Sequence, residues 1–98
     1  MWAEVACQAP KQGRVLRLQY DSYIRSIEVH AVGITKDGND IMRVWQTGGG
    51  SVSNEPVGWK LLRLDEAGGA SITDTPSSAP RMGLKRGDRA MERIYCEV

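Results

Sequence analysis

Apolar and polar residues alternate with a period of two over most of this chain, a pattern typical of half-buried β-strands. The clearest examples are Val15 to Tyr20, where Leu16, Leu18 and Tyr20 share a side, and the segment that begins at Tyr23. Strands are predicted at residues 15–20, 23–34, 41–46, 59–65 and 91–98, with a weaker one at 70–73. Residues 2–12 instead place apolar side chains on one helical face, and Pro10 and Gly13 end that helix.

Turn residues separate these segments. Asp21-Ser22 predicts a tight turn and Asp37-Gly38 a hairpin, whereas the alternation slips at Gly33, which indicates a bulge or bend. Residues 47–58 contain three successive glycines and Pro56 and are predicted to be a loop. The predicted core comprises Leu16, Leu18, Ile27, Val29, Val44, Leu62, Leu64 and Ile94.

Together these elements predict a mostly-β fold, a small SH3-like or Sm-like β-barrel of five or six strands with a short N-terminal helix. The 98 residues suffice for one domain, spanning 1–98, and a hydrophobic content of 41% is ordinary for a globular protein.

The net charge of +1 excludes the global basic field of a strong nucleic-acid binder, although a local patch stays open. No apolar run approaches the length of a membrane span, and the N-terminus lacks the basic region of a signal peptide, so we expect a cytoplasmic protein. Cys7 and Cys96 lie near opposite ends of the chain. They could meet if the termini do, but in a reducing cytosol we expect free thiols.

Nothing in the sequence supports catalysis. His30 is the only histidine, and no paired nucleophile and base, metal-ligand set or phosphate loop occurs. We therefore expect no enzymatic activity, no metal and no cofactor.

Several polar residues stand within apolar strands. Ser26, Glu28 and His30 form one face of a strand, either a wall of a ligand site or, as the pattern favours, a solvated face. Arg43 and Arg63 could bind phosphate or carboxylate with their forked guanidinium groups, or could pair with acids such as Asp65.

The basic stretch from Arg81 to Arg89 contains Lys85 and Arg86 as well. It is either a phosphate-contacting arm or, more commonly for such charge runs, a solvated loop. Trp2, Trp45 and Trp59 could stack bases, but tryptophan in a strand more often packs in the core.

Three segments resemble the WYL domain of bacterial transcription regulators. They are Val15-Leu16-Arg17-Leu18-Gln19-Tyr20, Ile27-Glu28-Val29-His30-Ala31-Val32-Gly33 and Trp59-Lys60-Leu61-Leu62-Arg63-Leu64-Asp65. The resemblance implies an Sm-like barrel that senses a ligand, often nucleic acid or a nucleotide, without catalysis. It places the ligand-binding residues at Tyr20, His30 and Arg63, to which the strand pattern adds Arg43.

The chain departs from the family in three respects, one of which is that Glu66-Ala67 follows Asp65 where the family has Arg-Ile. The family's Trp-Tyr-Leu triplet would fall near Asp40-Ile41-Met42, and almost nothing precedes the barrel where a helix-turn-helix would stand. We therefore expect a stand-alone barrel, or one that works on a partner.

The leading hypothesis is a regulatory module that binds single-stranded nucleic acid or a nucleotide, with His30, Arg43 and Arg63 lining one concavity. The alternative is a protein-interaction or structural module without a small ligand, and a homodimer is expected in either case. Neither hypothesis involves a membrane.

Overall fold

A computed structural model of the chain describes residues 2–50 and 56–98. Helix α1 (Trp2–Gln12) precedes six strands, and a single 3-10 turn, η1 (Leu64–Glu66), connects the fourth strand to the fifth. The strands are β1 (Arg14–Tyr20), β2 (Tyr23–Ile34), β3 (Asp40–Gly49), β4 (Gly58–Arg63), β5 (Ala67–Pro76) and β6 (Arg93–Glu97).

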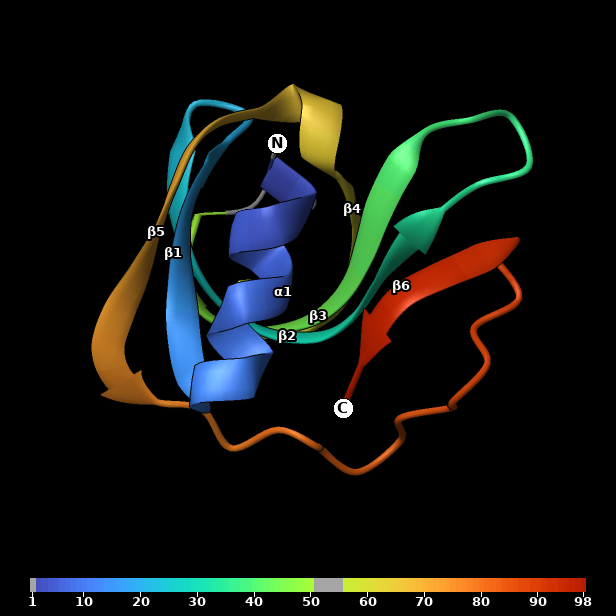
Figure 1. Cartoon of the computed structure of the whole chain (residues 1–98). Coiled ribbons are helices and arrows are strands. Elements are labelled where there is room, and N and C mark those ends of the chain that lie inside the picture. The colour runs from blue at the N-terminus through green and yellow to red at the C-terminus, as the bar shows by residue number, and fades with distance from the viewer. Residues whose placement is uncertain (1, 51–55) are drawn as a thin grey trace.

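All six strands belong to one antiparallel sheet with the order β4-β3-β2-β1-β5, and β6 pairs with β2 outside this path. The sheet is strongly curved around α1 (Figure 1). The mostly-β class, the six strands and the N-terminal helix are confirmed. Strands β4 and β5 lie at the two ends of this path and, in the described part of the chain, do not pair with each other, so the sheet is open.

Two tight turns form where the sequence predicts them. Asp21 and Ser22 both have positive φ, of 52° and 65°, which is the backbone of a two-residue hairpin connection. At the second turn Gly38 has a φ of 85° and donates its N–H to the carbonyl oxygen of Thr35. These turns set the β1–β2 and β2–β3 pairings.

Strand β2 is the centre of the sheet, since β1, β3 and β6 all pair with it. Its register shifts between Val29 and Ala31 against β3, and between Val32 and Gly33 against β6. A Cβ atom at Gly33 would collide with the carbonyl oxygen of Arg93, so glycine permits the close approach of β6. The irregularity predicted at this point is confirmed.

The main core fills the concave side of the sheet beneath α1, whose Ala6 and Ala9 are buried against it. Seven of the eight predicted core residues are buried; the eighth, Ile94, is half-buried and packs on a second, smaller cluster around Ala31, Ile41 and Met91.

Several boundaries differ from the predictions, and the last strand, predicted at 91–98, spans Arg93–Glu97. Strand β3 continues through Gly48 to Gly49, inside the predicted loop 47–58, because both residues pair with β2. Part of that loop, residues 51–55, lies outside the described residues. The predicted strand 59–65 ends at Arg63, where η1 adds helical structure beyond the first dozen residues, and β5 is longer than predicted.

The expectation of free thiols is wrong, because Cys7 and Cys96 form a disulfide. Their Cα atoms are 5.9 Å apart, within the usual range for a disulfide. Since α1 packs beside β6 at the edge of the core, two residues separated by 89 positions become neighbours. Among the described residues, no helix has the length and apolar character that a bilayer crossing needs.

Candidate functional site

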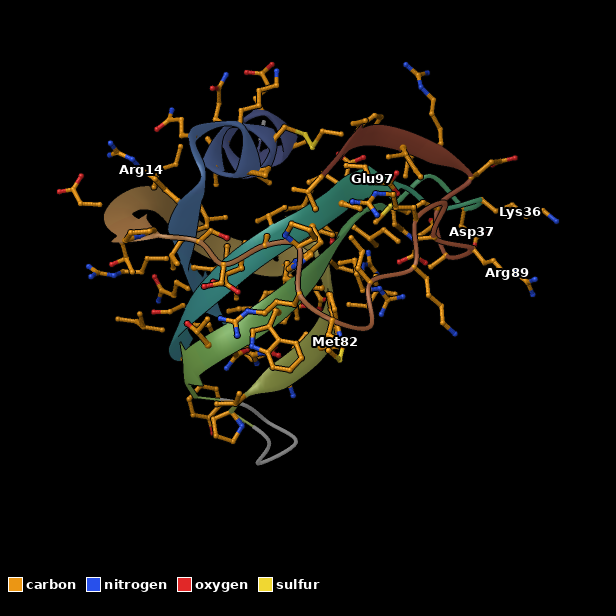
Figure 2. All side chains as sticks on the ribbon, turned by 90° about the horizontal axis from the view of Figure 1, so that it is seen from below. Arg14, Lys36, Asp37, Met82, Arg89 and Glu97 are labelled. Carbon is orange, nitrogen blue, oxygen red and sulfur yellow. A yellow bond between two sulfur atoms is a disulfide. The ribbon has the colours of Figure 1, made fainter. Side chains whose placement is uncertain are left out.

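The convex face of the sheet is covered by the chain itself. Residues 77–92, here called the C-terminal coil, run from β5 to β6 across β2, β3 and β4 (Figures 1 and 2). Because side chains alternate along a strand, the residues next to inward-facing Val29 and Val44 point outward to this coil. The polar contacts of Glu28, His30 and Arg43 form in the layer between sheet and coil.

Glu28 of β2 is the first anchor of the coil. Its carboxylate accepts hydrogen bonds from Arg81, through Nε at 2.6 Å and Nη2 at 3.2 Å, and from the backbone N–H of Ser78 at 2.6 Å. Glu28 is only 1% exposed. Burial alone would raise the pKa of this carboxyl group, but the hydrogen bonds from Arg81 and Ser78 outweigh burial, and the pKa is lowered.

His30 is the second anchor and is completely buried. Its Nε2 accepts the backbone N–H of Arg81 at 2.9 Å, and its Nδ1 lies 2.9 Å from the carbonyl oxygen of Glu28. This network assigns the proton to Nδ1, which then donates to that carbonyl. Burial lowers the pKa of His30 and favours the neutral ring. The predicted solvated face is therefore wrong for Glu28 and His30, since the coil covers both.

Aromatic side chains complete this layer. The His30 ring meets Trp59 edge-on at 4.7 Å, and Trp59 meets Trp45 at 5.4 Å. The guanidinium of Arg81 lies 5.4 Å from the centre of the Trp45 ring, a cation–π distance. Both tryptophans are on the outer face rather than in the main core. The side chain of Trp2 lies outside the described part of the chain.

Beyond these anchors the coil curves away from the sheet and leaves a cavity of about 650 Å³, here called the basic pocket. Its walls are Arg43 of β3, Trp59 of β4 and coil residues 83–89. Gly83 has a φ of +95°, and a Cβ there would lie 3.1 Å from the Trp59 indole nitrogen. Glycine thus allows the coil to turn closely over the indole ring.

The charges of the basic pocket are predominantly positive. Arg43, Lys85, Arg86 and Arg89 line it together with a single acid, Asp88. In the described structure Lys85 and Arg89 are exposed and have no ion pair or hydrogen bond. Two exposed cations without an internal counter-charge in the described structure therefore line the cavity.

Arg43 is the ordered cation of the pocket. Its Nε and Nη2 donate to the two carboxylate oxygens of Asp88 at 2.7 and 3.3 Å, and Asp88 also accepts the backbone N–H of Ala90. The hydrogen bond from Arg43 lowers the pKa of Asp88. This pairing fixes the plane of the guanidinium, while Nη1 makes no hydrogen bond within the described structure.

The predicted site residues separate into two groups. Arg43 lines the pocket, whereas His30 lies buried behind Trp59. Arg63 is elsewhere, where it pairs with Asp65 through Nη2 at 2.6 Å and bonds Asn39, and its backbone N–H donates to the hydroxyl of Tyr20. The expectation that His30, Arg43 and Arg63 line one concavity is therefore wrong, and for Arg63 the ion-pair alternative holds.

The sequence interpretation missed the partnership of Glu28 with Arg81 and the role of Asp88. Fifty-three positions separate Glu28 from Arg81, so no local pattern connects them. The available signal was a carboxylate flanked by Ile27 and Val29 in a central strand, since such a group needs a cation when it is buried. The basic stretch itself was identified, and it supplies most of the pocket wall.

No three His, Cys, Asp or Glu side chains within the described ranges cluster as metal ligands would. Comparison with protein-family models, with characterised proteins and with solved structures finds no significant match for this chain.

Proposed function

We propose that this chain is a non-enzymatic binding module whose basic pocket holds a phosphate-bearing ligand with an aromatic base. A free nucleotide and one unit of a single-stranded nucleic acid share this chemistry. The observation that carries the proposal is the gathering of four basic side chains and an indole ring around one cavity.

The pocket suits such a ligand in size and chemistry. A volume of about 650 Å³ falls within the usual range for small-molecule sites. Arg43, held by Asp88, presents an oriented guanidinium, while Lys85 and Arg89 are free to reach a phosphate. Trp59 offers an aromatic surface, on which a base gains stacking energy regardless of its identity.

We further propose that the fold is a small SH3-like or Sm-like barrel and that the chain is a divergent WYL-like module. The strand order, with consecutive antiparallel strands and β5 returning to β1, supports the barrel type. Within this proposal the ligand site lies on the convex face beneath the C-terminal coil. Tyr20 and Arg63 then form a separate, structural contact.

A protein-interaction function is the second candidate, and one observation favours it. Met82, which precedes Gly83 at the pocket wall (Figure 2), is 96% exposed. Leu61 on β4 is also exposed. Exposed apolar side chains beside a charged pocket are common where a protein partner docks. A homodimer remains a prediction within this alternative.

The direct test titrates the purified protein with ATP, adenosine and a short oligothymidylate, by calorimetry or fluorescence anisotropy. We expect ATP or the oligonucleotide to bind more tightly than adenosine, and binding to weaken between about 50 and 200 mM salt because phosphate contacts are electrostatic. Tighter binding of ATP would identify the ligand as a free nucleotide, and tighter binding of the oligonucleotide would identify it as single-stranded nucleic acid. Failure of both to bind refutes the proposal.

The location is tested by Arg89→Ala, with Arg14→Ala as the matched control. The two arginines lie at opposite ends of the molecule (Figure 2), and Arg14 forms an exposed ion pair with Asp74. Losing one charged hydrogen bond costs about 1.5–3 kcal/mol, so Arg89→Ala should weaken binding by about tenfold or more. Equal affinities of the two variants would place the ligand elsewhere.

A further inference from the structure

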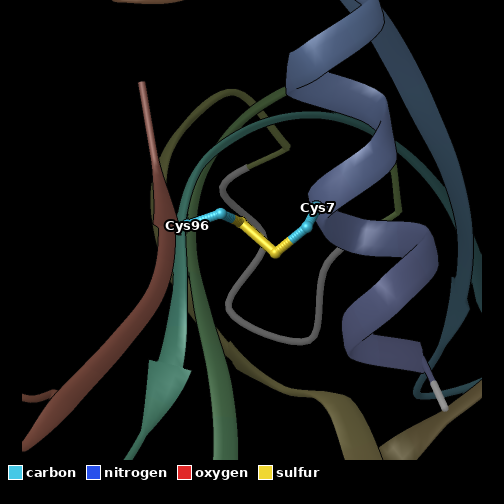
Figure 3. The surroundings of a disulfide bond; sticks show 2 residues. All are labelled: Cys7 and Cys96. Atoms are coloured by element: carbon cyan, nitrogen blue, oxygen red, sulfur yellow. A yellow bond between two sulfur atoms is a disulfide. The ribbon is translucent and has the colours of Figure 1, made fainter.

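The Cys7–Cys96 disulfide joins the helix on the concave side of the sheet to the last strand (Figure 3). Cys7 lies in the middle of α1, and Cys96 is the fourth residue of the five-residue strand β6. Strand β6 pairs with β2 alone, at one margin of the sheet. The cross-link therefore secures a short peripheral strand whose backbone ladder is shared with β2 alone.

The residues that follow Cys96 hold the wall of the basic pocket. The Glu97 carboxylate accepts the backbone N–H of Gly87 at 2.9 Å, and the carbonyl oxygen of Val98 accepts Nε of Arg86 at 2.9 Å. Gly87 and Arg86 both line the pocket. A continuous series of contacts thus runs from the disulfide through the end of β6 to the ligand-binding loop.

We infer that the Cys7–Cys96 disulfide is a redox control of the basic pocket: the oxidised bond holds β6, and through Glu97 the pocket wall, in the binding geometry. This inference rests on the proposed function. Reduction frees the end of β6 to fray, as chain ends with few partners do. The coil next to Lys85 then loses the contacts that hold Arg86 and Gly87, while Asp88 stays paired with Arg43.

The chemical step is thiol–disulfide exchange with a dithiol reductant. One thiolate of the dithiol attacks a disulfide sulfur, its second thiolate resolves the mixed disulfide, and two protons are taken up by the released sulfurs. Cys7 and Cys96 end as two thiols, and the dithiol ends as a disulfide. Two electrons pass from the dithiol to the protein.

The rest of the site is anchored independently of the disulfide. The start of the C-terminal coil is held by Glu28 and His30, and α1 keeps Ala6 and Ala9 buried in the main core. Reduction should accordingly loosen the far wall of the pocket while the sheet and its core persist.

The first experiment measures binding of ATP and of a short oligothymidylate to the oxidised protein and to the same protein after dithiothreitol treatment. We expect reduction to weaken binding by about fivefold or more, the lower end of usual coupling between two sites. The Cys7→Ser/Cys96→Ser variant is the control: it should bind like the reduced protein and should not respond to dithiothreitol. Circular dichroism establishes that each form is folded.

The second experiment keeps the disulfide and removes the contact that transmits it. In the oxidised protein Glu97→Ala should weaken binding by a similar factor, and Glu97→Gln should restore it because the amide oxygen still accepts the Gly87 N–H. Reduction of the Glu97→Ala variant should then cause little further loss of affinity, since changes in one series of contacts are not additive.

The outcomes separate the two proposals. If the oxidised protein binds neither probe, the proposed function fails. If it binds, but reduction leaves the affinity unchanged, the redox inference fails and the function stands. If the reduced protein unfolds, Glu97→Ala decides, because an unchanged affinity in that folded variant overturns the inference.

Discussion

Replacing Glu28 with glutamine should destabilise the domain more than any comparable change of an exposed acid. The carboxylate accepts three hydrogen bonds, two from Arg81 and one from Ser78, and it is almost completely buried. Glutamine keeps the shape and one acceptor, but it removes the charge and turns an N–H group toward a donor. The result is a weaker and partly mismatched anchor.

The magnitude follows from the number of bonds. A hydrogen bond to a charged group is worth about 1.5–3 kcal/mol, roughly twice a neutral one, so halving three such bonds removes about 2–4 kcal/mol. The Arg81 side chain is 34% exposed, and water screens part of the interaction. We therefore expect the free energy of unfolding to fall by about 2–3 kcal/mol.

Urea denaturation followed by tryptophan fluorescence measures this loss directly, because Trp45 and Trp59 lie in the same layer as Arg81 and His30. With an m value of about 1 kcal/mol/M, the unfolding midpoint should drop by roughly 2–3 M. Asp74→Asn is the matched control, since Asp74 is fully exposed and its ion pair with Arg14 should contribute no measurable stability.

A loss below about 0.5 kcal/mol for Glu28→Gln would refute the reasoning, because it would equate this buried carboxylate with a surface acid. Acid titration gives a second check. The pKa of Glu28 is lowered in the fold, so its stabilisation is complete above its ordinary value of 4.5 and is lost as the pH falls through the lower folded value. The Glu28→Gln variant should lack this pH-dependent part of the stability.

Three further outcomes are expected. Burial lowers the pKa of His30, so the wild type should lose stability as the pH falls below the ordinary value of 6.5. In His30→Gln the urea midpoint should change less between about pH 7.5 and about pH 5.5 than in the wild type. The same pH dependence in both proteins would contradict the buried neutral ring. Leu64→Ala should cost about 2–5 kcal/mol in the same urea assay, since Leu64 is 2% exposed in the main core, and a loss under about 0.5 kcal/mol would show that the site is not packed. Arg63→Ala should leave binding of ATP and oligothymidylate unchanged, because Arg63 pairs with Asp65 away from the basic pocket; weaker binding by a folded variant would restore Arg63 to the ligand site.

Local patterns predicted most of the secondary structure because strands and tight turns depend on neighbouring residues. The alternation from Val15 to Tyr20 and the turn at Asp21-Ser22 needed no knowledge of the rest of the chain, and both are present. The length of β5 was underestimated because its glycine-rich start has low strand propensity, and pairing with β1 overrides that propensity.

The site was harder to predict because its contacts join distant segments. Arg43 was identified correctly as an arginine that needs a partner, but Asp88, which lies 45 positions away, was not identifiable as that partner. His30 was placed at a ligand by the family resemblance, and its strand pattern favoured a solvated face, whereas here the chain covers its own sheet with the C-terminal coil. The second layer that buries Glu28 and His30 comes from a segment whose composition predicts only turns.

The disulfide described above also determines how this domain would respond to mechanical force. A pull applied at the two ends of the chain passes along the first turns of α1, through the sulfur atoms of Cys7 and Cys96, and out through the last residues of β6. The intervening chain, which contains every strand pairing made by β1 to β5, lies outside that path and bears no load. While the bond is oxidised, force applied from outside the two cysteines cannot unravel the sheet. After reduction the same force would act on the packing of α1 and on the pairing of β6 with β2.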